Sequence, residues 1–261
     1  MKYFYLMFAL LIINTSCSSV INLLTKKRDA VLTESQSNPI DYTIWNELLN
    51  KHVKESGRVD YKGFMADSDK FNSFLSLIQN NHPNEKNWNK DEQLAFWINT
   101  YNAFTVKVIL DNYPVEGIKK IKSGVPFINS VWDVKNIDIE SATYSLNQIE
   151  HGILRPTFEE PRIHFAVNCA SISCPNLLNE AFLPNRIDAQ LDKAAKDFLY
   201  DSSKNEIDGD KLKVSKIFNW YKSDFTKNGS LNQYLQQYID ADISSKKIGY
   251  TDYDWNLNDV E

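Results

Sequence analysis

The sequence predicts an α+β fold that is mainly helical, with a small sheet, in a single domain. Two observations predict it: helical runs open with capping boxes, and the segments with strand character are short. Of the 261 residues, 43% are hydrophobic, which is typical of a globular protein. A domain typically has about 150 residues, so residues 40–261 could form one domain or two. We favour one, because no linker interrupts that range.

The strongest helical signal is a capping box formed by Asn89 and Glu92. Apolar residues then recur at helical spacing as far as Pro114, which should end the helix. Phe96 and Phe104 widen the apolar stripe. We therefore expect a helix that is buried on more than one face.

Shorter sequence patterns predict the helices and strands that follow this helix. A second capping box, Ser145 with Gln148, predicts a short helix that Pro156 should stop. The run Ile163–Val167 has the length and composition of a buried strand, so the cysteines after it should lie in the loop that leaves the strand. Two helices and a short strand are expected further on, at 189–199, 215–225 and 248–250.

The N-terminus has the features of an export signal. Lys2 precedes an apolar stretch, Tyr3–Ile13, that is too short to span a bilayer. We predict a lipoprotein-type signal peptide over residues 1–16, in which Cys17 is lipidated and becomes the mature N-terminus. Asn14 stands where a lipobox usually has an aliphatic residue, so an ordinary cleaved secretory signal is the alternative.

Residues 17–39 are polar, include a basic triplet and end at a proline, which predicts a tether. The protein should therefore be exported to the cell envelope, periplasmic or associated with the outer membrane. Its expected partners are the membrane, through a lipidated Cys17, and an unidentified envelope substrate or protein.

Charge argues against nucleic acid as a partner. Removing residues 1–16 takes away one of the 29 basic residues and none of the 34 acidic ones, which leaves a net charge of −6. The cluster of Lys119, Lys120 and Lys122 has no glycine-rich loop beside it, so we interpret it as a solvated surface.

Most of the chemistry that the sequence suggests lies in Arg162–Pro175, which reads RIHFAVNCASISCP. A histidine, His164, stands here near Cys169 and Cys174, and a thiol beside an imidazole can be deprotonated to a nucleophilic thiolate. On a strand, His164 and Asn168 would share one face. The alternatives are a disulfide or two buried apolar cysteines, and a core histidine.

Several runs resemble the domain-of-unknown-function family 547. The strongest are FWINTYNA (96–103), IEHGILR (149–155), RIHF (162–165) and SCP (173–175), and shorter ones lie at 57–61, 218–225 and 253–258. The resemblance spans nearly the whole chain after the tether. It implies a single intact domain and brings no activity with it. Its hallmark positions here include Asn99, Asn102, Glu150, His151, Arg155, His164 and Cys174.

These positions also support a physical argument. Asn99 and Asn102 lie three residues apart on an apolar helix, so their amides must be hydrogen-bonded if buried; they could orient an imidazole, hold a substrate carbonyl or tie down loops. Glu150 and His151 point about 100° apart on a helix, so one can face a site while the other packs. Arg155 shares a face with His151 and is expected to form a salt bridge or to bind an anion.

Our functional hypothesis is a cysteine-dependent hydrolase or acyl transferase that acts on a peptide, amide or thioester and needs no cofactor. Cys174 would be the nucleophile and His164 or His151 the base. Glu150, or one of the two helix asparagines, would orient that base.

The rival hypothesis is a non-catalytic binding or structural module of the envelope with a Cys169–Cys174 disulfide. Its aromatic residues would pack or grip a partner; these are Trp220, Tyr221, Tyr253 and Trp255. A metal site drawn from Glu150, His151, His164 and Cys174 is a third, weaker alternative, because no compact motif such as HExxH occurs.

Overall fold

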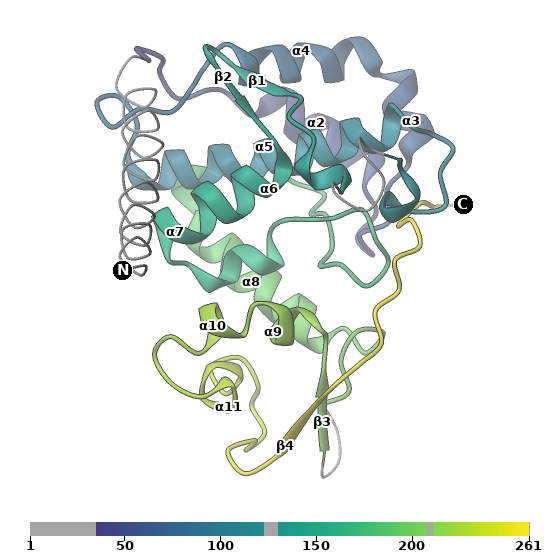
Figure 1. The fold of residues 1–261 in the computed structure, drawn as a ribbon, viewed down its shortest axis with the longest axis vertical. Coiled ribbons are helices and arrows are strands. Elements are labelled where there is room, and N and C mark those ends of the chain that lie inside the picture. The colour runs from purple at the N-terminus through teal and green to yellow at the C-terminus, as the bar shows by residue number, and fades with distance from the viewer. Residues whose placement is uncertain (1–34, 123–129, 208–210, 261) are drawn as a thin grey trace, which may run out of the picture.

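Helix α5 (Lys90–Leu110) organises the larger lobe. In this computed structural model, which describes residues 35–122, 130–207 and 211–260, Asn89 and Glu92 form the predicted capping box. Every residue from Leu94 to Val106 is buried, which confirms the expectation of burial on more than one face. Helices α3 (Tyr61–Ala66), α4 (Ser68–Gln79) and α6 (Leu146–Ile149) contact α5, and α2 (Thr43–His52) packs on α3 and α4 (Figure 1).

Helix α6 opens with the predicted Ser145–Gln148 capping box and continues through a π-helical segment, η3 (Glu150–Leu154), into α7 (Arg155–Phe158). The prediction that Pro156 stops this helix is wrong. Pro156 occupies the first turn of α7, where the N–H that proline lacks is not required. The wider π turn before it resets the hydrogen-bond pattern, so the chain stays helical as far as Phe158.

The strand predicted at Ile163–Val167 is a 3-10 helix, η4 (Pro161–Phe165). Pro161 fixes a helical φ at its first turn, and the Glu160 carboxylate accepts the N–H of Arg162. The Arg162 guanidinium also binds Glu160 and two aspartates of α8 (Ile187–Tyr200). A five-residue apolar run has no period that separates strand from buried helix, and these polar contacts fix the helical form.

The strands form two separate pairs in the described part of the chain. Strands β1 (Ile137–Ile139) and β2 (Ala142–Tyr144) are antiparallel, with Ile137 opposite Tyr144. Strands β3 (Lys211–Val214) and β4 (Lys247–Tyr250) are parallel, and β4 confirms the short strand predicted near the C-terminus. The mainly helical α+β class is therefore confirmed.

The smaller lobe holds α9 (Ile217–Trp220), α10 (Lys222–Phe225) and α11 (Leu231–Leu235). The single helix expected over 215–225 is broken at Tyr221, whose backbone leaves the helical region. The helix predicted over 189–199 is confirmed by α8, whose first half packs in the core of the larger lobe and whose second half packs in that of the smaller one. Short 3-10 helices complete the fold: η1 (Ile118–Lys120), η2 (Val131–Asp133) and η5 (Pro184–Arg186).

The segment after β4, residues 251–260, which we call the C-terminal strap, runs from the smaller lobe back to the larger one (Figure 1). Its backbone pairs with two distant parts of the chain. Ile172 donates to the carbonyl of Asn256 at 2.9 Å, and the N–H of Val59 donates to the carbonyl of Asn258 at 2.9 Å. The strap therefore crosses the segment that carries the cysteines.

Packing against the domain begins before the predicted boundary at residue 40. Ser35 is buried and donates to the carbonyl of His82 at 2.8 Å, so residues 35–39 of the predicted tether already contact the fold. The predicted signal peptide, Cys17 and the rest of the tether lie outside the described residues. Within the described ranges, none of the helices combines the length and apolar character needed to cross a membrane.

Candidate functional site

The two cysteines lie in a loop that is held closed from inside. We call residues 166–175 the thiol loop. The carboxamide of Asn168 accepts the N–H of Ala170 at 2.8 Å and donates to the carbonyl of Pro175 at 2.7 Å. Ala170 has φ +59°, in the left-handed region that a non-glycine residue rarely adopts, and so it marks a constrained turn. These bonds fix the loop that presents both sulfurs.

The helix asparagines hold backbone segments in place. Asn102 donates to the carbonyl of Ala166 and accepts the N–H of Asn168, both at 2.9 Å, so it fastens the start of the thiol loop to α5. Asn99 makes the same pair of bonds with Phe182, at 2.7 and 3.1 Å. Of the roles that the sequence left open, the described contacts match the tying down of loops.

Cys169 and Cys174 are both free thiols in the structure. The Cys169 side chain is partly exposed, and its sulfur lies 3.2 Å from the hydroxyl of Ser171 and 3.4 Å from that of Tyr253 on the C-terminal strap. Cys174 is 4% exposed, accepts the N–H of Cys169 at 2.9 Å and points its thiol at the carbonyl of Val167, 3.9 Å away. Cys169 is thus the less buried of the two cysteines.

The two thiols differ in acidity for physical reasons. A hydrogen bond from Cys174 lowers the pKa of Cys169 to about 7, and the hydroxyls of Ser171 and Tyr253 add to this against the opposing effect of burial. Burial raises the pKa of Cys174 well above that of a free thiol, and the neighbouring Cys169 raises it further. Near neutral pH, Cys169 is the thiol that ionises.

His164 is buried against Asp224. It is 2% exposed, and its Nε2 lies 2.8 Å from a carboxylate oxygen of Asp224, while Tyr221 stacks on the imidazole at 3.8 Å between ring centroids. Because a carboxylate accepts only, Nε2 carries the proton and Nδ1 is left as an acceptor, and this buried atom has no hydrogen-bond partner among the described residues. Burial lowers the pKa of His164 despite the carboxylate, so the ring is neutral.

Arg155 forms a salt bridge with Asp224, the carboxylate that also binds His164. Its Nε and one terminal nitrogen donate to the two Asp224 oxygens at 2.6 and 2.8 Å, which gives the salt bridge expected for Arg155. Burial would raise the pKa of Asp224, but the hydrogen bonds from His164 and Arg155 outweigh it and hold that pKa well below its usual range. Arg155 also lies 3.0 Å from Nδ1 of the exposed His151, as their shared helix face predicts.

Glu150 points inward from the π-helical segment. It is 5% exposed, and its Oε1 has no hydrogen-bond partner, while the adjacent His151 faces solvent, so the predicted divergence of these two side chains is confirmed. Burial raises the pKa of the Tyr221 hydroxyl, and the Glu150 carboxylate raises it further by its charge and a hydrogen bond. The Glu150 charge also acts on Cys169 and His164. The Glu150 charge is therefore within electrostatic range of both Cys169 and His164.

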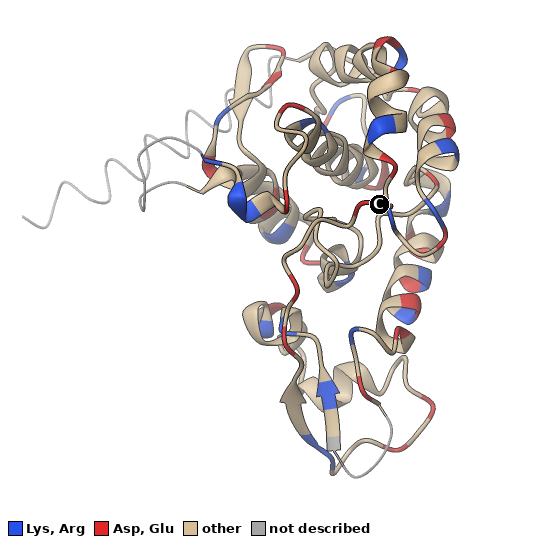
Figure 2. Cartoon of the chain, turned by 90° about the vertical axis from the view of Figure 1, so that its right-hand side faces the viewer, with Lys and Arg blue, Asp and Glu red and all other residues tan. Residues whose placement is uncertain are grey.

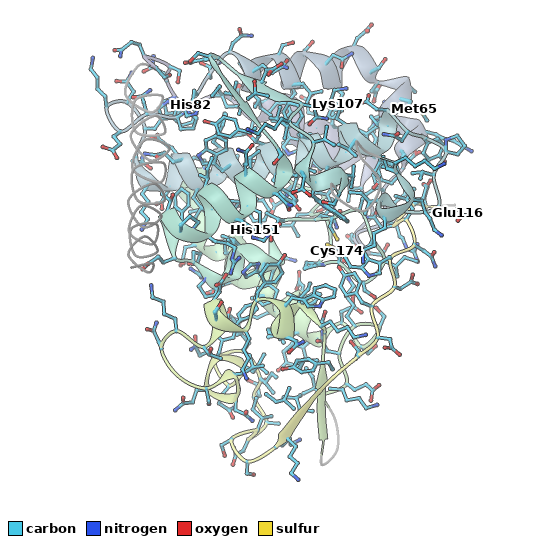
Figure 3. The ribbon with its side chains drawn as sticks, in the orientation of Figure 1. Met65, His82, Lys107, Glu116, His151 and Cys174 are labelled. Atoms are coloured by element: carbon cyan, nitrogen blue, oxygen red, sulfur yellow. The ribbon has the colours of Figure 1, made fainter. Side chains whose placement is uncertain are left out.

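His151 and Cys174 appear near the waist of the molecule, between the large lobe and the small one (Figure 3). The described hydrogen bonds of His164 go to Asp224, and those of the sulfurs stay within the thiol loop and its strap. A direct thiol–imidazole hydrogen bond is therefore absent from the described residues. Tyr221 stacks on both His164 and His151, but the predicted contact between Cys174 and a histidine is not formed among the described residues.

Sequence reasoning gave no role to Asp224, Ser171 or Lys119. Asp224 lies in a run that resembles the family, and a carboxylate at such a position was the available signal. Ser171 lies between the two cysteines, where its hydroxyl could have been expected to bond a thiolate. Lys119, in the cluster interpreted as solvated surface, places its ammonium 3.5 Å from the ring centre of Trp255, and its charge interacts with Cys169.

Four aromatic residues pack into one cluster beside Cys169. Tyr253, which contacts the sulfur, lies 4.8 Å from Trp220 and 4.5 Å from Trp255 between ring centroids, and Trp255 contacts Trp132 at 6.0 Å. Trp220 is 46% exposed. Three of the four aromatic residues of the rival hypothesis therefore pack together, whereas Tyr221 stacks on His164, and Trp220 leaves part of its ring for a ligand.

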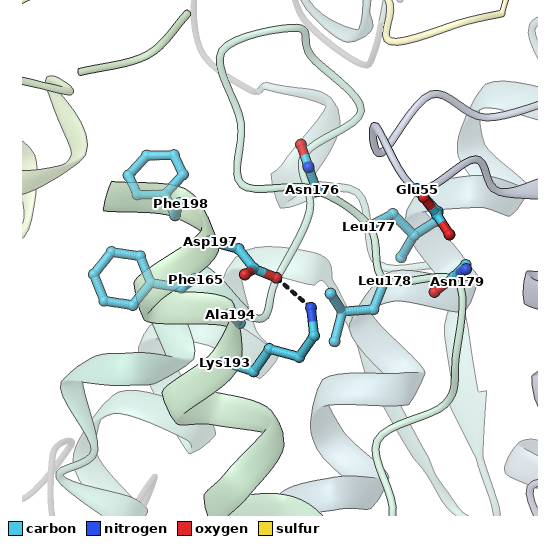
Figure 4. A pocket seen from close by; sticks show the side chains of 10 residues that line it. All are labelled: Glu55, Phe165, Asn176, Leu177, Leu178, Asn179, Lys193, Ala194, Asp197 and Phe198. Carbon is cyan, nitrogen blue, oxygen red and sulfur yellow. Dashed lines mark hydrogen bonds and ion pairs between the residues drawn. The ribbon is translucent and has the colours of Figure 1, made fainter. Parts of the chain in front are cut away.

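Three hollows lie near the thiol loop and the Arg155–Asp224 pair. A cavity of about 20 Å³, the size that holds a water molecule, is lined by Cys174, Ser171 and Asn168 among others. A groove of about 210 Å³ is lined by Arg155 and Asp224. A pocket of about 310 Å³ lies between α8 and the chain after the thiol loop; Figure 4 shows its lining, which includes none of the predicted site residues.

Metal binding and charge add little to this picture. Among the described residues, no group of three or more His, Cys, Asp and Glu side chains is arranged to hold a metal ion. Basic and acidic residues are interspersed over the side of the ribbon seen in Figure 2.

Residues 85–199 match a family model. It is described as a protein of unknown function, DUF547. The matched segment contains the hallmark positions of the family resemblance, while the flanking runs at 57–61, 218–225 and 253–258 lie outside it. No curated protein and no solved structure matches the chain. The DUF547 segment supplies the thiols and His164, whereas Asp224 and Tyr253 come from the chain after it.

Proposed function

We propose that this protein is an exported, lipid-anchored hydrolase or acyl transferase that uses Cys169 as its nucleophile on a peptide, amide or thioester. One observation carries the proposal: the sulfur of Cys169, the less buried of the two cysteines, lies between two hydroxyl groups in a constrained loop. Hydroxyl donors at 3.2 and 3.4 Å stabilise a thiolate more than a thiol. A thiolate populated near neutral pH can attack an acyl carbon without a base bonded to it.

The geometry favours Cys169 over Cys174, the candidate preferred from the sequence. A nucleophile must reach the substrate, and Cys174 is 4% exposed while Cys169 is partly open. The Cys174 sulfur also lies against the backbone of the thiol loop, where it accepts the N–H of Cys169. Its role in the proposed reaction is to lower the pKa of Cys169 through their hydrogen bond.

His164 is the proposed base. Asp224 fixes the proton on Nε2 and so leaves the Nδ1 lone pair free, which is the state required of a base that removes a proton from water or from an acceptor. Asp224 thus has the orienting role first assigned to Glu150 and the asparagines. In the first step, the Cys169 thiolate bonds to the acyl carbon and the bond from that carbon to the leaving group breaks; a thiol leaves as its thiolate, and an amine leaves with a proton taken from water. In the second step, Nδ1 of His164 takes a proton from water or from the acceptor as that group bonds to the acyl carbon, and Cys169 is released as the thiolate.

The test is to trap the acyl group on sulfur. The purified protein is mixed with an acetyl thioester, quenched in acid and mapped by mass spectrometry. We expect an acetyl group on Cys169, turnover beyond one equivalent, the same adduct in Cys174→Ala, and neither in Cys169→Ala. Circular dichroism controls for folding. An acetyl group only on Cys174, or no adduct on the wild-type protein, would refute the assignment.

Lipid anchoring is tested separately. The apolar stretch that ends at Ile13 and the following Cys17 support it. Cells fed a palmitate analogue should label the wild-type chain and the neighbouring control Ser18→Ala, but not Cys17→Ala. If label persists in Cys17→Ala, or if the mature chain begins at another residue, an ordinary secretory signal replaces the lipoprotein signal.

A further inference from the structure

We propose that Cys169 and Cys174 also form a dithiol–disulfide couple that exchanges with disulfides of small thiols or peptides. This activity rests on the proposed function only in taking Cys169 as the attacking sulfur. Both thiols are free and lie in the same closed loop. The backbone N–H of Cys169 donates to the Cys174 sulfur at 2.9 Å, which places the buried thiol against the backbone of its partner.

The two thiols have the different environments that exchange needs. The attacking thiol must be accessible and ionised; Cys169 is the less buried of the two cysteines, and its sulfur lies beside the hydroxyls of Ser171 and Tyr253. The resolving thiol must be out of reach of the substrate but close to the attacking sulfur. Cys174, which is buried against the Cys169 backbone, meets that condition.

The exchange balances in two steps. The Cys169 thiolate attacks one sulfur of a disulfide, R–S–S–R, forming a mixed disulfide and releasing one RS⁻. Cys174 then loses its proton, and its sulfur attacks the Cys169 sulfur, releasing the second RS⁻. The dithiol has lost two electrons and two protons, and the substrate disulfide has gained them as two thiols. The only co-reactant is the disulfide itself.

Formation of the mixed disulfide in the first step makes Cys174 easier to ionise for the second step. While Cys169 is ionised, its charge and its hydrogen bond help to raise the pKa of Cys174. In the mixed disulfide the Cys169 sulfur is neutral, so that contribution disappears and Cys174 ionises more readily. The loop also keeps the resolving sulfur close, because Asn168 joins Ala170 to Pro175 across the turn.

The experiment uses the full chain with Cys17→Ser, so that Cys169 and Cys174 are the remaining thiols. The reduced protein is mixed with excess glutathione disulfide and followed by intact mass and thiol titration. We expect both protein thiols to disappear, two glutathiones to be released per protein, and no glutathione to stay attached. Cys174→Ser should instead keep one glutathione on Cys169, and Cys169→Ser should react at least tenfold more slowly.

A stable glutathione adduct on the wild-type thiols, or no reaction, would overturn the exchange activity. The wild-type stoichiometry decides this even if a variant fails to fold. The outcome is separable from that of the acyl experiment. An acyl group on Cys169 without internal disulfide formation leaves the hydrolase and removes the exchange, whereas an internal disulfide without acyl transfer does the reverse.

Discussion

Asp224→Ala should lower the free energy of unfolding by about 2 kcal/mol, within the range for removing a charged hydrogen-bond partner and leaving a buried donor unpaired. The Asp224 carboxylate accepts hydrogen bonds from His164 and from two nitrogens of Arg155. Without it, both ring nitrogens of His164 are buried and unpaired, and the Arg155 charge loses its partner. Chemical denaturation at pH 7 measures the loss.

The matched control is Asp252→Ala. Asp252 pairs with Lys216 at 3.0 Å on the open surface, so its removal should cost no more than about 0.5 kcal/mol. The Asp224 assignment fails if both variants lose the same small amount.

The loss in Asp224→Ala should also depend on pH. An unfolded histidine binds a proton below about pH 6.5, whereas folded His164 resists protonation because burial lowers its pKa. Asp224 opposes that lowering, so its removal should depress the pKa of His164 further. The stability gap between variant and wild type should then widen as the pH falls from 7 to 5. Below about pH 4 the gap should narrow, because Asp224 of the unfolded wild-type chain then binds a proton that the folded carboxylate, with its lowered pKa, does not bind.

Local signals predicted the helices well. The capping boxes at Asn89 and Ser145 depend on residues three apart, so the chain around each one is enough to define where a helix begins. The end of the second helix could not be predicted this way. Pro156 stops an ordinary α-helix, but a π turn before it places the proline in a first turn, and no local pattern announces a π turn.

The segment before the thiol loop shows a second limit. Ile163–Val167 is apolar without a clear period, so its composition suits a strand as well as a buried 3-10 turn. The contacts that decide it come from α8, where Asp188 and Asp192 bind Arg162. These partners follow about thirty residues later in the chain, beyond the window in which secondary structure is predicted.

The sequence predicted several of the residues that belong to the candidate site, but it did not predict which of them contact one another. The sequence placed His164, Cys169 and Cys174 together, but the exposure of each thiol depends on the C-terminal strap that brings Tyr253 over the loop. Likewise, Asp224 reaches His164 from the smaller lobe, sixty residues on. Long-range packing therefore decided which cysteine is open and which carboxylate orients the histidine.

Asn102→Ala should cost about 3 kcal/mol of stability and should also change the thiol chemistry. The Asn102 amide is buried and satisfies the carbonyl of Ala166 and the N–H of Asn168, and alanine leaves both backbone groups unpaired. Asn168 in turn closes the thiol loop, so its displacement should loosen the contacts of the Cys169 sulfur. Alkylation of Cys169 should then titrate above its wild-type midpoint of about 7.

Asn99→Ala separates the two effects. Asn99 makes an equivalent pair of bonds with Phe182, so this variant should lose a similar amount of stability. It does not bond the thiol loop, so the midpoint of Cys169 alkylation should stay near 7. Equal midpoints in the two variants would mean that Asn102 only stabilises the fold, whereas a shift confined to Asn102→Ala means that helix α5 positions the nucleophile through that amide.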